Sequence, residues 1–149
     1  WRNGYYCNQV SCIPLPNDFC SSAQPISDGT WDLLTLGAMS DDDPYNDAQC
    51  TGTYLGVMNA DVWFSYIACE TGSMTVSTCD LINFDSDIVV YEGTCDGMTQ
   101  VACNGDGNGD SGCQDYYSAI DYNVIKGGTY YIRIGGWQGA TGEGTLTIE

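Results

Sequence analysis

Short apolar runs rich in β-branched and aromatic residues recur along the chain between clusters of Gly, Asn and Asp. In SAIDYNVI, apolar and polar residues alternate, so Ile120, Tyr122 and Val124 are expected to face a core and the residues between them to face water. Similar runs predict strands at 61–69, 73–79, 86–93, 118–125, 128–136 and 144–149. No window shows a persuasive helical period, so the pattern predicts an all-β, antiparallel β-sandwich.

The first sixteen residues, WRNGYYCNQVSCIPLP, differ in composition from the rest of the chain. They include three aromatic residues and two cysteines, and end in Pro-x-Pro. They are expected to form an extended N-terminal arm at 1–16 ahead of a single sandwich domain at 17–149. A chain of 149 residues, 43% of them hydrophobic, is long enough to form one such core.

The charge is strongly negative: three Lys and Arg stand against twenty Asp and Glu, a net charge of −17. Phosphate backbones and anionic headgroups are bound by clustered basic residues, so neither nucleic acid nor a membrane surface is expected as a partner. No apolar run approaches the ~20 residues of a membrane span. With no charged-then-apolar leader before Trp1, the sequence is interpreted as a mature secreted protein.

Nine cysteines and no histidine favour a disulfide framework of an extracellular or periplasmic protein. Zinc is disfavoured because no C-x-x-C pair occurs. The odd count leaves one thiol that is buried and free or joins another chain. Spacing does not determine the pairing; we expect Cys103 with Cys113 and Cys20 with Cys50, and leave open Cys7 with Cys12 and pairings among Cys69, Cys79 and Cys95.

The order of motifs resembles the bacterial pre-peptidase C-terminal (PPC) domain family. The resemblance rests on NDFCSSAQPISDGT, ADVWFSYIACETGSMTVSTC, FDSDIVVYEGTC, ACNGDG and GGTYYIRIGGWQGATGEGTLTI, and covers roughly 17–149. It implies a jelly-roll-like sandwich that is not itself catalytic and is usually appended to secreted proteases or surface proteins. It also implies that calcium, collagen, chitin or another polymer is a candidate ligand.

The stretch NGDGNGDSGC is a candidate calcium loop. Its oxygen-bearing residues alternate as in a calcium loop, with Gly109 at the sharp turn, and a further carboxylate follows at the twelfth position. The candidate ligands are Asn104, Asp106, Asn108, Asp110 and Asp115. The alternative is a polar hairpin loop that is closed by a disulfide.

Two more acidic clusters are interpreted as solvated carboxylates, with a cation site as the alternative. One is SDDDPYND, with Asp41, Asp42, Asp43 and Asp47. The other is FDSD, with Asp85 and Asp87. Asp18 and Asp61 are expected to accept hydrogen bonds from turn amides or to bind a metal.

Catalysis is not expected, because without histidine a Ser or Cys nucleophile lacks its usual base, and Lys126 is the only lysine. Aromatic side chains in turn-rich segments are the candidate ligand contacts, since flat rings stack on sugars. They are Trp31, Trp137, Tyr116, Tyr117 and Tyr45, whereas Trp63, inside an alternating strand, is expected in the core.

The sequence therefore predicts a secreted, non-catalytic, calcium-stabilised module that binds an extracellular polysaccharide or matrix protein, or attaches to a cell surface. The alternative is a structural subunit of an extracellular filament, with copies of itself as partners. There the arm would add to the sheet edge of a neighbour, and a cysteine would lock the contact. The residues assigned to this assembly role are Tyr5, Tyr6, Cys7 and Cys12.

Overall fold

The computed structural model describes residues 5–7, 12–40, 45–50, 53, 55–79, 81–107 and 113–149, with side chains from Leu15 onward. Strands dominate these ranges, and the helical turns are short 3-10 helices: η1 (Cys20–Ser22), η2 (Asp47–Gln49) and η3 (Trp137–Gly139). None of the helices in the described part of the chain is long and apolar enough to cross a membrane.

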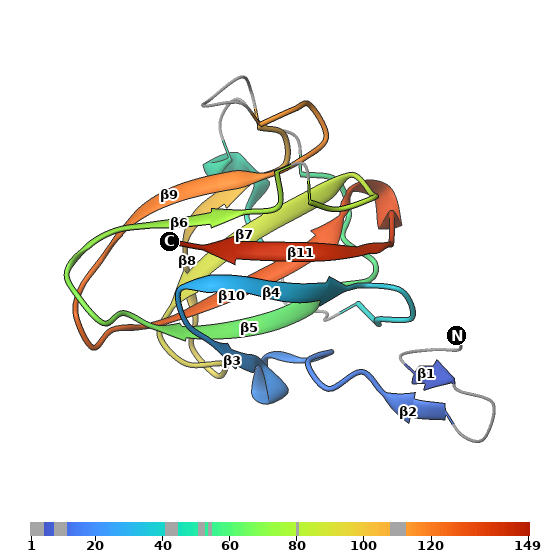
Figure 1. Cartoon of the computed structure of the whole chain (residues 1–149), viewed down its shortest axis with the longest axis horizontal. Helices are drawn as coiled ribbons and strands as arrows, with labels where there is room; N and C mark the ends of the chain where they lie inside the picture. The colour runs from blue at the N-terminus through green and yellow to red at the C-terminus, as the bar shows by residue number, and fades with distance from the viewer. Residues whose placement is uncertain are drawn as a thin grey trace.

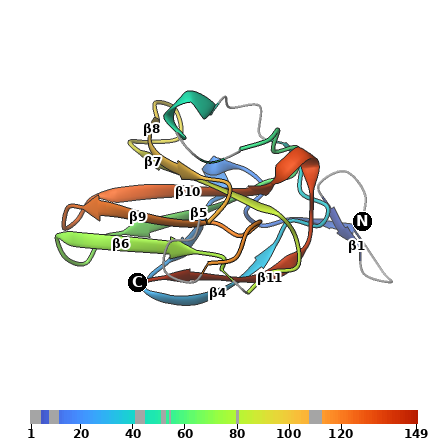
Figure 2. The ribbon, with the colours of Figure 1, turned by 90° about the horizontal axis from the view of Figure 1, so that it is seen from above.

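Two sheets pack face to face, and Figure 2 shows them as two layers. The five-stranded sheet has the order β3-β5-β10-β7-β8, with β3 (Gln24–Ile26), β5 (Val62–Ile67), β10 (Thr129–Gly136), β7 (Ser86–Glu92) and β8 (Thr99–Asn104). The four-stranded sheet has the order β4-β11-β6-β9, with β4 (Gly29–Leu34), β11 (Glu143–Ile148), β6 (Gly72–Ser77) and β9 (Ala119–Val124).

All six strands expected from the alternation are present, and the all-β sandwich is confirmed (Figure 1). In β9, Ile120 and Val124 are buried and Tyr122 packs against the core, as the alternation predicted. The pairings are antiparallel except at one edge, where the short strand β3 runs parallel to β5. The strands β3, β4 and β8 were not expected, because their runs lack a clear alternation of apolar residues.

The main core lies between the sheets and is formed by the inward residues of alternate positions. From the five-stranded sheet come Val62, Phe64, Ile88, Val90, Ile132 and Ile134, and from the four-stranded sheet Met74, Val76, Leu146 and Ile148. These side chains are at most 1% exposed. Burial of this apolar surface is the main favourable term in folding.

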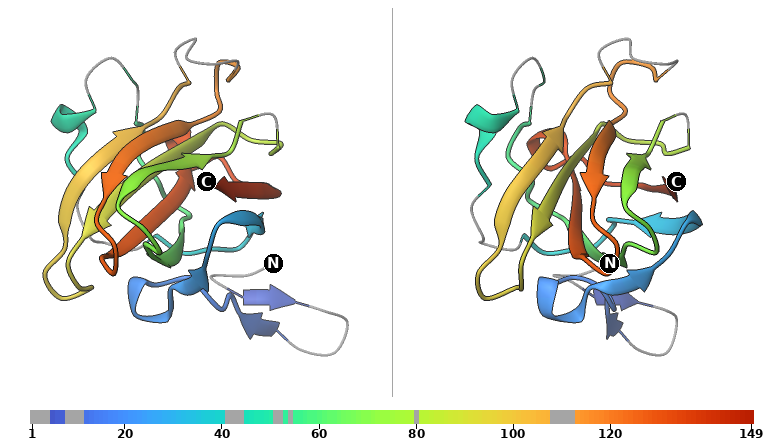
Figure 3. Two further views of the ribbon diagram at one scale, coloured as in Figure 1. Left: turned by 60° about the vertical axis from the view of Figure 1, so that its left-hand side comes forward. Right: turned by 90° about the vertical axis from the view of Figure 1, so that its left-hand side faces the viewer.

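The five-stranded sheet is also buried on its other side, which we call the outer face. Trp63, Val89 and Tyr91 lie there beneath a covering segment, residues 45–50 and 55–58, which contributes Leu55 and Met58 to the cluster. Figure 3 shows η2, part of this segment, beside β8. The disulfide Cys50–Cys103 joins the covering segment to β8, and Cys20–Cys95 joins η1 to the loop between β7 and β8. The sheet is therefore buried on both faces.

Near the N-terminus, β1 (Tyr5–Cys7) and β2 (Cys12–Pro14) pair with each other as a separate two-stranded antiparallel sheet. Figure 1 shows this hairpin apart from the sandwich. Their register sets Tyr5 opposite Pro14 and Cys7 opposite Cys12. In its described backbone the arm is thus a hairpin, whereas an extended segment was expected. The side chains of Tyr5, Tyr6, Cys7 and Cys12 lie outside the described residues, and their role in assembly stays a prediction.

Candidate functional site

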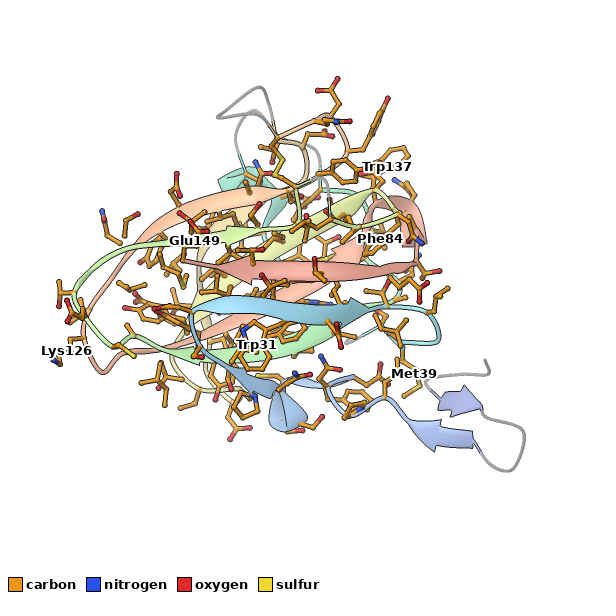
Figure 4. The ribbon with its side chains drawn as sticks, in the orientation of Figure 1. Trp31, Met39, Phe84, Lys126, Trp137 and Glu149 are labelled. Carbon is orange, nitrogen blue, oxygen red and sulfur yellow. A yellow bond between two sulfur atoms is a disulfide. The ribbon has the colours of Figure 1, made fainter. Side chains whose placement is uncertain are left out.

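A pocket of about 190 Å³ opens at the end of the sandwich where β7 begins and β10 ends. Asp85, Asp106, Tyr116 and Trp137 line it, and we call it the acidic-aromatic pocket. Figure 4 shows Trp137 and Phe84 at this end of the molecule and Lys126 at the opposite end. A second hollow beside it shares Asp85 and Tyr116, and is further lined by Asn83, Phe84, Gln114, Asp115 and Tyr117.

Both aromatic residues are attached to the start of β7 by main-chain hydrogen bonds. The Trp137 N–H donates to the Asp85 carbonyl at 3.1 Å, and the Ser86 N–H donates to the Tyr116 carbonyl at 3.0 Å. Trp137 and Tyr116 are separated in the sequence, yet they bond to the consecutive residues Asp85 and Ser86, where β7 begins. This backbone arrangement places both rings beside Asp85.

Tyr116 has a left-handed backbone conformation, with φ of 76°. This region is uncommon for a bulky residue and marks local strain, which proteins often retain at functional sites. The Asp106 carboxylate accepts the Tyr116 N–H at 3.2 Å and so supports this conformation. The Tyr116 side chain is 64% exposed, so its ring is available to a ligand instead of contributing to a core.

Trp137 begins η3 and is 44% exposed. Its indole lies against the backbone of Gly56, where an added Cβ would come within 2.5 Å of the Trp137 ring. The Gly139 N–H donates to the Val57 carbonyl at 3.1 Å, which ties η3 to the covering segment. Gly56 therefore has to be a glycine for the ring to keep this position.

Ser86, which follows Asp85, belongs to a polar network with Thr78 and Ser118, and all three are fully buried. The hydroxyls of Thr78 and Ser86 are 2.8 Å apart, and the Ser118 hydroxyl donates to the Ser86 carbonyl. The disulfide Cys79–Cys113 adds a covalent link beside it. A network with its polar groups satisfied rigidifies its surroundings, so it helps to fix the start of β7, next to Asp85.

Asp87 is the second residue of β7, and Asp85 immediately precedes the strand. Asp87 is fully buried, and neither carboxylate oxygen has a hydrogen-bond partner among the described residues. Burial, followed by the carboxylates of Asp85, Asp106 and Asp47, raises the pKa of Asp87 to about 8, and the backbone of Gly56 acts in the opposite direction. Burial and then Asp106 also raise the pKa of Asp85.

A second fully buried carboxylate on the outer face is paired. The Arg133 Nε donates to Asp61 Oδ2 at 2.7 Å, and both side chains are at most 1% exposed. The Arg133 guanidinium also lies over the rings of Tyr45 and Trp63, 5.4 and 5.3 Å from their centroids. Burial lowers the pKa of Arg133, but Asp61 outweighs it and the net shift is upward.

The expected calcium ligands are only partly described. Asn104 and Asp106 accept backbone N–H groups, from Ala119 and Tyr116 respectively, and Asp115 is exposed. Asn108 and Asp110 lie outside the described residues. Among the residues that are described, no three acidic or cysteine side chains form a group that could hold a metal ion. Calcium binding in this loop stays a prediction.

The other acidic residues have different surroundings. Asp41, Asp42 and Asp43 lie outside the described residues, and Asp47 is exposed at the first position of η2. Asp18 accepts the Met39 N–H at 2.8 Å, as expected for a turn. Asp87, by contrast, is not solvated as we expected, because the covering segment buries the outer face of β7.

The expected disulfide pairings were wrong, although all four cysteines form disulfides. Cys103 lies opposite Val89 of the outer face, so it bonds to Cys50 of the covering segment and not to Cys113. Cys20 bonds to Cys95, and Cys113 to Cys79. Among the described side chains Cys69 is free, and it is exposed instead of buried.

The candidate aromatic residues divide into two groups. Trp137 and Tyr116 are brought together at the pocket. Trp31 lies on β4, packs against the main core and donates to the Ser27 carbonyl at 2.8 Å. Tyr117 also packs against the core, and Tyr45 lies over Arg133. Trp63 is fully buried, as predicted.

Sequence reasoning missed the roles of Asp87 and Gly56. A signal for Asp87 was available: SDIVVYEG is apolar on both sides, which is typical of a strand buried on both faces, and Asp87 shares its side with Val89 and Tyr91. No local pattern indicates Gly56, because its neighbour Trp137 is distant in the sequence.

The comparisons with known proteins place the fold and the family. A search of curated proteins finds no match. A solved structure of the pre-peptidase C-terminal domain of collagenase from Bacillus anthracis is similar over 85% of this chain and 94% of its own, with 12% identity and a TM-score of 0.50. The PPC resemblance seen in the sequence is thereby confirmed at the level of fold. A model of T9SS-associated, galactose binding domain-like proteins matches residues 16–148. This chain belongs to the T9SS-associated, galactose binding domain-like family.

Proposed function

We propose that this protein is a secreted, non-catalytic module that binds an extracellular glycan in the acidic-aromatic pocket. The observation that carries the proposal is the convergence of two exposed aromatic rings, Trp137 and Tyr116, with two carboxylates at one pocket. Rings stack on the C–H faces of sugars, and carboxylates accept hydrogen bonds from sugar hydroxyls.

Three further observations support this proposal. The galactose binding domain-like family fits carbohydrate binding. The three disulfides found among the described side chains and the T9SS association of the family point to an oxidising location outside the cytoplasm. The strained backbone of Tyr116 and the close fit of Trp137 on Gly56 hold the rings in place before a ligand arrives, which reduces the entropic cost of binding.

Retention on insoluble chitin, cellulose and agarose tests the proposal. We expect the protein to be retained on at least one of them, and Trp137→Ala to abolish retention. Phe19→Ala is the matched control, because Phe19 is 41% exposed, close to the 44% of Trp137, but lies outside the pocket. Equal retention of both variants, or no retention of the wild type, would contradict the proposal.

A further inference from the structure

The charge around the acidic-aromatic pocket is one-sided. Asp85 and Asp106 line it, and the adjacent hollow adds Asp115. Neither hollow has a basic residue among its described lining residues. Arg133 is paired with Asp61, and Lys126 lies at the other end of the molecule (Figure 4). A ligand that enters this pocket therefore meets a negative potential without a compensating cation among the described residues.

Asp87 provides a second, independent observation. Its fully buried carboxyl group has no hydrogen-bond partner among the described residues, and the carboxylates of Asp85 and Asp106, which line the pocket, act on it electrostatically. An unpartnered buried carboxylate is costly, and polar groups of this kind in native structures call for an explanation. A positive charge in the pocket would stabilise the ionised forms of Asp85, Asp87 and Asp106 together.

The surroundings suit an organic cation better than a bare metal ion. Calcium needs six to eight oxygen ligands at short range. Within the described residues, no acidic group is arranged to hold a metal. The pocket has a volume of about 190 Å³, and its walls include exposed rings of Trp137 and Tyr116, whose faces attract a cation as well as a sugar.

We propose that the acidic-aromatic pocket selects an amino sugar of a polysaccharide, with the protonated amine facing Asp85 and Asp106 and the sugar ring stacked on Trp137. The proposal rests on the glycan-binding function proposed above. A neutral sugar of the same shape is expected to bind more weakly than the amino sugar, because it leaves the carboxylates without a counter-charge.

Isothermal titration calorimetry of the whole chain with a β-1,4-linked glucosamine oligomer and its fully N-acetylated counterpart tests the selection. The two ligands share a backbone and differ in charge. We expect the amine form to bind at least about tenfold more tightly, the gain of one charge-assisted or cation–π contact. If both bind equally and Trp137→Ala abolishes both, glycan binding stands and selection for the amine is wrong. If neither binds, both proposals fall.

Charge variants separate a specific contact from general attraction to a polyanion. Asp106→Asn removes the charge but keeps an oxygen that accepts the Tyr116 N–H, and Asp85→Asn removes the neighbouring charge. We expect each to lower the preference for the amine form several-fold. Asp32→Asn is the matched control, because Asp32 is exposed on β4, away from the pocket. Equal losses in all three variants would overturn the assignment to this pocket.

Two other ligands test the source of the positive charge. Titration with a lysine oligomer of similar charge should show weaker binding, since it has no sugar ring to stack on Trp137. Equal or tighter binding would overturn the amino-sugar assignment in favour of a basic protein. Calcium chloride should not compete with the glucosamine oligomer beyond the effect of ionic strength, which a sodium chloride control measures. Stoichiometric displacement by calcium would show a metal site instead.

Discussion

Asp61 and Asp87 lie on the same outer face of the five-stranded sheet, and both are fully buried. Asp61 forms an ion pair with Arg133, which is also packed between two aromatic rings. Asp87 has acidic neighbours instead, and neither of its oxygens has a hydrogen-bond partner among the described residues. Burial alone therefore does not define the state of a carboxyl group, and its partners decide whether it stays ionised.

The difference also separates a structural region from a functional one. The Asp61 region is a closed, charge-compensated cluster beneath the covering segment. Asp87 instead interacts electrostatically with Asp85 and Asp106, which line a pocket with exposed rings and a strained tyrosine. Uncompensated charge, strain and exposed aromatic surface in one place are more typical of a ligand site than of a stabilising core.

The largest effect is expected from breaking the compensated pair. Arg133→Leu leaves Asp61 buried without its counter-charge, so we expect the free energy of unfolding to fall by about 3–5 kcal/mol. Equilibrium unfolding in guanidinium chloride measures the loss. The double variant Asp61→Leu/Arg133→Leu should recover part of the lost stability. A loss below about 1 kcal/mol in Arg133→Leu would show that the ion pair is not important for stability.

Removal of the Cys50–Cys103 disulfide tests the role of the covering segment in burying Asp61 and Asp87. We expect Cys50→Ala/Cys103→Ala to lower stability by about 2–4 kcal/mol, because this bond closes a long loop of the unfolded chain. Loosening the covering segment should also hydrate Asp87 and lower its pKa toward that of an ordinary carboxyl group. Thermal unfolding measures the first effect and carboxyl NMR titration the second. An unchanged Asp87 pKa in a destabilised variant would contradict the role of the cover.

Asp87 should make stability depend on pH. Its pKa of about 8 lies above the ordinary value of 3.8, so between these values the folded protein keeps a proton that the unfolded chain releases. Its contribution to stability is complete below pH 4 and is lost as the pH rises to 8. Asp87→Asn lacks this change, so its stability relative to the wild type should rise steadily over this range. A difference that does not vary with pH would show that Asp87 titrates normally.

Substitutions of Tyr116 are expected to change stability least. They also distinguish an effect on stability from an effect on ligand binding most clearly. Tyr116→Gly removes the ring and relieves the left-handed backbone, so we expect no loss of stability, or a gain of up to about 1 kcal/mol, together with weakened glycan binding. Tyr116→Ala is the control, because it removes the ring but keeps the strain. If Tyr116→Gly is less stable than Tyr116→Ala, the strain is not real.

The strands and the main core were predictable because alternation along a single strand is local information. Ile120, Tyr122 and Val124 lie where their spacing indicated. The pocket was predictable only in part: Trp137 and Tyr116 were named as candidate ligand contacts, but nothing in the sequence placed them beside Asp85. That contact depends on hydrogen bonds between segments far apart in the chain.

The disulfide pairing and the burial of Asp87 could not be predicted from the sequence for the same reason. Cys103 and Cys113 are close in sequence, but Cys103 points to the outer face of β8, toward Cys50. Tertiary packing determines which face of the sheet the covering segment occupies. The local spacing of residues along the chain does not indicate this face. Asp87 is buried by the same segment, so both expectations failed for one physical reason.

The most direct test of the central claim is an NMR titration of the whole chain with the glucosamine oligomer. We expect the largest shift changes at the Trp137 indole N–H and the Tyr116 amide, with smaller ones at Asp85 and Asp106, and no change at the Trp31 indole on the other sheet. Changes centred on Trp31, or an unperturbed Trp137 under saturating ligand, would contradict the account.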